Sequence, residues 1–133
     1  MKTLRIFSLL LITGAAAFTS CDKNDDESTA ARLQKYWLVD SVAIKNTTAA
    51  GSVTLVYNGT AADYYDFKTN DSLYFKLNTE EDVLPYSILS DSWILVDGDS
   101  AQIVSLSGSK LQLYKKDITS STDYVETRAY FRQ

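Results

Sequence analysis

The sequence predicts an all-β fold, an antiparallel up-and-down meander closed into a barrel of about eight strands. After residue 32, short runs rich in Val, Ile, Tyr and Phe are broken about every 6 to 12 residues by clusters of Gly, Asn, Asp or Ser, which is typical of all-β chains. Leu73, Phe75 and Leu77 alternate with Tyr and Lys, so one face of that strand is buried and the other is wet. Closing the sheet removes its exposed edges, although a sandwich remains an alternative.

The elements follow from the positions of these runs. One helical turn is possible over 30–36, and nothing else looks helical. Strands are expected at 37–44, 53–57, 63–68, 72–77, 83–89, 92–96, 101–106, 110–116 and 124–131. Turns are expected at 58–59, 69–71, 90–91, 97–99 and 107–109, where Asn, Asp and Gly tolerate the positive φ of tight turns. Because the connections are short, consecutive strands should pair antiparallel.

The expected core comes from the inward residues of these strands. Trp37 should lie buried near one end of the barrel. The other expected core residues are Leu38 or Val39, Phe67, Leu73, Phe75, Leu77, Ile88, Ile94, Ile103, Leu111, Leu113 and Phe131. Pro85, the single proline, lies inside the 83–89 run. Proline cannot donate a ladder hydrogen bond, so it suggests an edge or a bulge there.

The amino-terminal segment predicts export. Lys2 and Arg5 precede an apolar run over 6–18, which small residues and Cys21 follow. A basic start, an apolar run and small residues are the pattern of a cleaved signal peptide, and the run is short for a transmembrane helix. Residues 1–20 are therefore predicted to be removed.

Cys21 is the only cysteine, and its place directly after the signal core resembles the lipobox of bacterial lipoproteins. The resemblance implies an acylated Cys21 that anchors the chain in a membrane. Residues 21–31 lack large apolar side chains and predict a flexible acidic tether, with one domain over 32–133. The acidic 23–27 stretch resembles the surface-export signal of Bacteroidota-type lipoproteins, or it is a solvated linker. Asp22 resembles the inner-membrane retention signal of enterobacterial lipoproteins instead. We expect an outer membrane lipoprotein on the cell surface or the periplasmic face.

The composition excludes several classes of function. Without residues 1–20, 11 basic residues remain against 17 acidic ones, so no nucleic-acid partner is expected. There is no histidine, and a lipidated Cys21 leaves no thiol, so we expect neither an enzyme, nor a metal site, nor a cofactor. The carboxylates Asp97 and Asp99 fit an ordinary hairpin turn, and those at 80–82 fit a solvated loop.

The segments 33–41, 65–67, 86–89, 94–96, 103–106, 111–113 and 130–132 together resemble the short lipocalin-like lipoproteins of Bacteroidota-type bacteria. Lipocalins open with Gly-x-Trp, and their tryptophan packs across the closed barrel end beneath an arginine of the last strand. Trp37 matches the tryptophan, whereas Lys35 replaces the glycine. The resemblance implies an eight-stranded barrel whose interior can hold one small apolar ligand. It also implies that Arg132 or Arg128 stacks near Trp37.

The candidate ligand-binding residues are Trp37, Tyr86, Trp93, Arg128 and Tyr130. If Arg128 and Tyr130 point inward, they resemble the Arg-x-Tyr pair that grips a carboxylate in fatty-acid-binding proteins. The apolar residues that alternate with them on this strand make the better core, which favours an outward Arg128. Trp93 lines a cavity or simply fills it, and core filling is the simpler role.

The expected function is a lipid-anchored, non-enzymatic envelope protein that binds a small apolar or amphipathic molecule in its barrel. The alternative is a filled barrel that serves as a protein-interaction or structural module of the envelope, with no protein partner identified. An eight-stranded barrel can be packed solid or hollow, so topology does not decide between the two.

Overall fold

A computed structural model describes residues 27–133, which fold almost entirely as β-structure. In chain order the elements are α1 (Thr29–Leu33), β1 (Tyr36–Thr48), β2 (Gly51–Asn58), β3 (Tyr64–Phe67), β4 (Ser72–Leu77), β5 (Glu80–Ser90), β6 (Trp93–Val96), β7 (Asp99–Leu106), β8 (Lys110–Ile118) and β9 (Tyr124–Arg132). Each of the nine predicted strands is present, and the all-β prediction is confirmed.

The sheet closes because β1 pairs with β9 as well as with its sequence neighbours. All pairs are antiparallel, and eight strands form a closed barrel with β2 as an extra strand outside the closure. The extra strand arises because the two halves of β1 pair with different strands on the same side. Residues 36–38 of β1 pair with β3, and its residues from Ser41 onward pair with β2. The predicted up-and-down barrel is therefore confirmed, apart from the displacement of β2.

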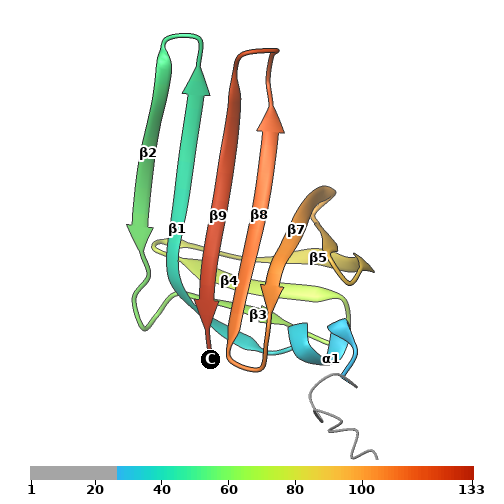
Figure 1. The fold of residues 1–133 in the computed structure, drawn as a ribbon. Coiled ribbons are helices and arrows are strands. Elements are labelled where there is room, and N and C mark those ends of the chain that lie inside the picture. Colours follow the sequence, from blue (N-terminus) through green and yellow to red (C-terminus); the bar gives the residue numbers. More distant parts are fainter. Residues whose placement is uncertain (1–26) are drawn as a thin grey trace, which may run out of the picture.

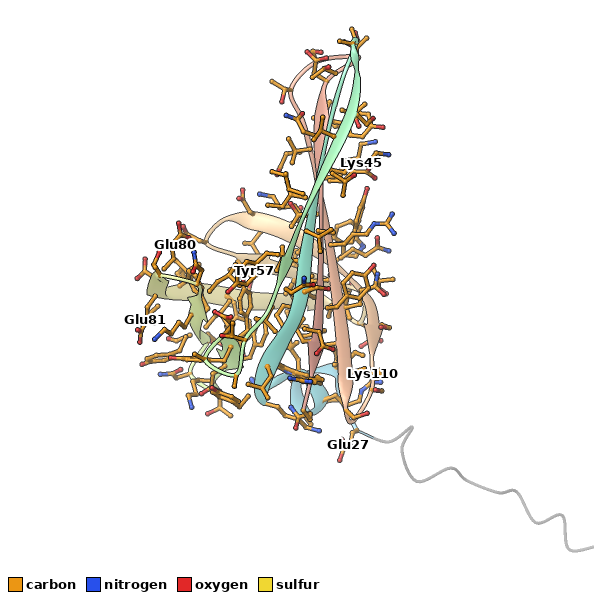
Figure 2. All side chains as sticks on the ribbon, turned by 90° about the vertical axis from the view of Figure 1, so that its left-hand side faces the viewer. Glu27, Lys45, Tyr57, Glu80, Glu81 and Lys110 are labelled. Carbon is orange, nitrogen blue, oxygen red and sulfur yellow. The ribbon has the colours of Figure 1, made fainter. Side chains whose placement is uncertain are left out.

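The long strands β2, β1, β9 and β8 rise beyond the rest of the barrel (Figure 1). The ladder between β7 and β8 ends at Tyr114, whereas β8 continues to Ile118. We define the sheet extension as residues 44–47, 52–55, 115–118 and 124–127, which lie in register across the four strands. Seen edge-on in Figure 2, this part is a single layer.

The barrel core is packed against α1, since Leu33 of this helix belongs to the core cluster. Trp37 has no exposed surface, and its indole Nε1 donates a hydrogen bond to the Leu33 carbonyl at 2.9 Å. The fully buried core residues are Leu33, Trp37, Val39, Phe67, Leu73, Ile94, Leu111 and Phe131. The predicted burial of Trp37 near one barrel end is confirmed. Phe75, Leu77 and Ile88, also expected in the core, are half-buried against it.

The helix α1 begins inside the range predicted as tether. Thr29 is buried and donates a hydrogen bond to Asp91 at 2.6 Å. Arg32 donates to the carbonyl of Leu106 at 3.2 Å. Hydrogen bonds therefore connect α1 to the turn before β6 and to the end of β7. The packed domain therefore starts at Thr29 rather than at residue 32. Among residues 27–133, no helix has the length and apolar character of a membrane span.

Pro85 lies where the pairing of β5 changes from β4 to β6. Residues 80–85 pair with β4, and the β6 ladder begins at Tyr86. Tyr86 N–H donates to Asp71 O at 2.9 Å, which makes the Ser72–Pro85 pair a non-hydrogen-bonded one. The missing proline N–H thus removes no bond to β4. Residues 80–84 pair on one side only, so Pro85 marks the start of an open edge, as one of the two sequence alternatives predicted.

Candidate functional site

A hollow with a mainly apolar wall lies inside the barrel at the end opposite α1. Its volume is about 290 Å³, and the residues around it come from six strands. Apolar side chains form most of the wall: Tyr65, Leu84, Val96, Ala101, Leu113 and Ala129. Polar groups stand among them: Asp97, Asp99, Tyr114, Lys115 and Thr127. This volume lies near the lower end of known small-molecule sites.

The pocket forms because inward side chains become smaller toward this end of the barrel. On β7 the inward residue is the buried Ile103 at one level and Ala101 at the next. On β9 it is the buried Phe131, then Ala129, then Thr127. Large inward side chains therefore fill one end of the barrel, and small ones leave the other end hollow.

A cluster of charges stands at the rim of the pocket. Lys115 Nζ lies 2.6 Å from Asp99 Oδ2 and 3.2 Å from Asp117 Oδ2. The hydrogen bond that Lys115 donates to Asp99 is the main cause that raises the pKa of Lys115, and Asp117 adds to it. Asp97 also lines the pocket. Two carboxylates therefore contact the one ammonium group and a third lines the same pocket, so the rim carries an excess of negative charge.

Tyr65 forms the aromatic part of the pocket wall. Its ring centroid lies 4.9 Å from that of Phe131 and 5.5 Å from that of Phe75, so the packed core holds the ring in place. Burial raises the pKa of Tyr65, and the charge of Glu80 raises it further. The phenol therefore stays neutral and can donate or accept a hydrogen bond.

The inner face of the sheet extension continues the pocket wall upward. Ile44, Val53 and Leu55 lie on this face and are 42%, 64% and 68% exposed. Ile44 pairs with the pocket residue Thr127 and also with Leu55, and Val53 lies two residues further along β2. An apolar molecule that projects from the pocket would therefore meet further apolar surface.

The sequence-predicted aromatic candidates lie away from this pocket. Trp37 is part of the packed core. Tyr86 is buried near the α1 end, where its hydroxyl donates to Lys68 O at 2.7 Å and accepts from Gln34 Nε2 at 3.2 Å. Trp93 is 43% exposed and alternates with the buried Ile94, so it points outward. The core-filling role predicted for Trp93 is therefore wrong, and the structure does not bring these three residues together.

Arg128 and Tyr130 face outward, because Ala129 and Phe131 occupy the inward positions of β9. The outward alternative, which the sequence favoured, is therefore confirmed, and these two residues form no carboxylate grip inside the barrel. The expected stacking on Trp37 is also wrong. Arg128 lies over the ring of Tyr114, and Arg132 pairs outside the barrel with Asp40. Cys21, the predicted lipidation site, lies outside the described residues.

Sequence reasoning missed the pocket residues, although one signal was present. Lys115 shares its face with the buried Leu111 and Leu113, and a single lysine on an apolar face marks the place where the interior opens. The turn at Asp97 and Gly98, with φ of 49° and 87°, is the hairpin turn that the sequence predicted. Among residues 27–133, no group of three or more acidic, histidine or cysteine side chains is arranged to hold a metal.

Comparison with known proteins adds no relative. No protein family, curated protein or solved structure matches the chain. The function must therefore be inferred from the pocket and the surfaces themselves.

Proposed function

We propose that this chain is a lipid-anchored, non-enzymatic binding module of the outer membrane, on its cell-surface or periplasmic face. It takes up a small amphipathic molecule at the open end of its barrel. The observation that carries the proposal is the hollow of about 290 Å³, whose apolar wall continues onto the inner face of the sheet extension.

The position of Glu27 supports the anchored arrangement. Glu27, the first described residue, lies at the end of the molecule opposite the tips of the sheet extension (Figure 2). An anchor at Cys21 attaches the barrel by its packed end. The pocket then opens away from the membrane, where a molecule from solution can reach it.

The charges at the rim select the polar group of the ligand. Lys115 already holds Asp99 and Asp117, and Asp97 leaves the rim with surplus negative charge. A carboxylate would be repelled, whereas an ammonium group would replace Lys115 or share its carboxylates. A unit charge about 4 Å away near a protein surface contributes up to about 4 kcal/mol, and solvent screening reduces this to about 1 kcal/mol at the exposed Asp99. We therefore infer an apolar body with a cationic head.

The first experiment identifies a retained ligand. Native mass spectrometry of the purified domain, followed by extraction, should show a small molecule. Hexylamine and hexanoate then form a matched pair at pH 7, with the same chain and opposite charge. Hexylamine should bind roughly tenfold more tightly, the ratio that about 1.4 kcal/mol gives. Equal binding of the two compounds would refute the cationic head and leave the apolar pocket intact.

A second experiment tests the pocket itself. Ala101→Phe fills the hollow from β7, whereas Ser100→Phe places the same ring on the exposed neighbouring position. The Ala101 variant should lose ligand binding and melt close to the wild type, because the ring enters empty space. The Ser100 variant should bind normally. Full binding by Ala101→Phe would show that the hollow is not the site.

One observation favours the alternative, a protein-interaction or structural module. β2 forms an open edge of the sheet, and its eight residues include no charged residue and no proline. Such an edge lacks the features that usually prevent pairing with another strand. If the purified protein is empty, and neither compounds nor Ala101→Phe change its melting temperature, this alternative becomes the better account.

A further inference from the structure

The outer face of the barrel wall carries a second group of functional side chains, separate from the pocket. Arg128 lies at its centre. Its partners across the ladders are Ala43 of β1 and Tyr114 of β8, and Gln102 of β7 pairs with Tyr114. In Figure 2, Lys45, which belongs to the same face, points away from the barrel.

Arg128 is held in position by an aromatic ring. Its guanidinium carbon lies 5.2 Å from the ring centroid of Tyr114. Within the described residues, Arg128 makes no hydrogen bond or ion pair, whereas Arg132 binds Asp40 at 3.2 Å and Arg32 binds a backbone carbonyl. A flat guanidinium on an aromatic ring keeps its N–H donors in one plane, which suits a carboxylate.

The one carboxylate beside Arg128 on β9 is already engaged. Glu126 accepts a hydrogen bond from the Tyr114 hydroxyl at 2.8 Å and lies 3.7 Å from Lys45 Nζ. The bond from Tyr114 is the main cause that lowers the pKa of Glu126, so this acid stays ionised and bound. This face carries more basic than acidic side chains, because Glu126 stands beside Lys45, Lys116 and Arg128. It is therefore locally positive in a chain of net charge −4.

Arg128 borders two shallow hollows. The hollow of about 290 Å³ is lined by Ala43, Lys45, Thr54, Glu126 and Arg128. The hollow of about 220 Å³ is lined by Gln102, Val104, Gln112, Tyr114 and Arg128. A cavity of about 150 Å³ holds a benzene ring, so each hollow has room for one substituted six-membered ring.

The lining of the hollows indicates the kind of ring. The amides of Gln102 and Gln112 and the hydroxyl of Thr54 both donate and accept hydrogen bonds, as sugar hydroxyls do. Arg128 lies over the ring of Tyr114, so this ring holds the guanidinium at the border of the smaller hollow. Neither hollow is a deep apolar pocket of the kind that anchors a protein partner.

We propose that the outer face around Arg128 binds a carboxylated saccharide. Arg128 holds the carboxylate, and the two hollows take the sugar rings on either side of it. The inward neighbours Thr127 and Ala129 belong to the barrel pocket, and Arg128 points the other way. Tyr114 borders both the barrel pocket and the smaller outer hollow, but its hydroxyl is bound to Glu126 on the outer face.

The test uses the purified chain and calorimetric titration. The probes are the tetramer of galacturonic acid and the matched neutral tetramer of galactose. The acidic tetramer should bind, and the neutral one at least tenfold more weakly. Arg128→Gln should weaken the acidic tetramer at least tenfold, and Arg128→Lys less, because lysine keeps the charge without the planar fork. The control is Arg132→Gln, on the same strand but already paired with Asp40, and it should bind as the wild type does.

Three outcomes would overturn the proposal. Equal binding of the two tetramers removes the role of the carboxylate. Unchanged binding in Arg128→Gln, in a variant that melts like the wild type, removes the role of Arg128. Binding of tetraglutamate as tight as that of the acidic tetramer makes the surface a site for acidic peptides instead. Ala101→Phe should leave saccharide binding unchanged, and a loss there would place the saccharide in the barrel pocket.

Discussion

Asp63 is the buried carboxylate on which the joint between β2, β3 and β4 depends. It is 1% exposed. Its Oδ2 accepts hydrogen bonds from the Tyr57 hydroxyl, the Thr60 backbone N–H and the Thr60 hydroxyl, each at 2.7 Å. Its Oδ1 accepts from Asn78 N–H at 2.6 Å, in a turn where Asn78 has a φ of 57°. One side chain thus ties together the end of β2, the following loop and the β4–β5 turn.

Asp63→Asn keeps the shape and removes one acceptor. If the amide oxygen takes the place of Oδ2, the amide N–H₂ faces the Asn78 N–H, and that hydrogen bond is lost. A bond to a charged group contributes about 1.5–3 kcal/mol, and an unsatisfied buried N–H costs about 1–3 kcal/mol. The expected loss is therefore about 3–5 kcal/mol of unfolding free energy, a large share of the usual 5–15 kcal/mol.

The pH dependence gives a second measurement of the same contact. The backbone N–H of Thr60 is the main cause that lowers the pKa of Asp63 below its ordinary value, with further help from Thr60, Tyr57 and Asn78. A lowered folded pKa adds stability above the unfolded pKa of about 4 and loses it as the pH falls. The wild type should therefore destabilise more steeply between pH 5 and pH 2 than Asp63→Asn does.

Urea unfolding at pH 7 and at several acidic pH values, followed by the fluorescence of the buried Trp37, measures both effects. Asp66→Asn is the matched control, because Asp66 pairs at the surface with Lys68 and such a pair contributes about 0–1 kcal/mol. A loss below about 1 kcal/mol for Asp63→Asn would refute the role given to this carboxylate. So would parallel acid unfolding of the variant and the wild type.

The other predictions concern the fold and the anchor. Gly59→Ala should prevent folding or lower the melting temperature strongly, because a Cβ would lie 1.9 Å from the Val39 carbonyl oxygen, and a near-wild-type melt would contradict this. Phe131→Ala should cost about 3–5 kcal/mol in urea unfolding, and the half-buried Phe75→Ala clearly less, whereas equal losses would contradict the core assignment. Cys21→Ser should release the protein from membranes with the domain still folded, and mass spectrometry should find Cys21 acylated in the wild type. An unmodified Cys21 in soluble wild-type protein would refute the anchor.

The strands were predictable because alternation and turn residues are local signals. The run 72–77 was predicted with the bounds that the structure has, since it alternates clearly between two turns. The end of β1 was not predicted correctly. The sequence after Ile44 turns polar, so the predicted strand stopped there, whereas β1 continues to Thr48. Ladder bonds to both β2 and β9 hold these polar residues in the strand, and hydrogen bonding to a partner leaves no mark in hydropathy.

The candidate sites were predictable only in part. Alternation along β9 was enough to place Arg128 outward, because Ala129 and Phe131 alternate with it. The partners of Arg128 and of Lys115 come from other strands. Tyr114 meets Arg128, and Asp99 meets Lys115, only after the barrel register is fixed. Register follows from bulges, such as that between Ile103 and Ser105, which the sequence pattern does not reveal.

The sheet extension explains why both candidate sites lie on the same few strands. A sheet with an apolar face normally buries it against a second layer, yet the extension is a single layer whose inner face carries the exposed Ile44, Val53 and Leu55. Its ladders and cross-strand pairs keep it formed without such a layer. Neighbouring residues of one strand therefore point into two different environments. On β9, Thr127 faces the pocket and Arg128 the outer hollows, so one strand separates an apolar, negatively rimmed site from a polar, positively charged one.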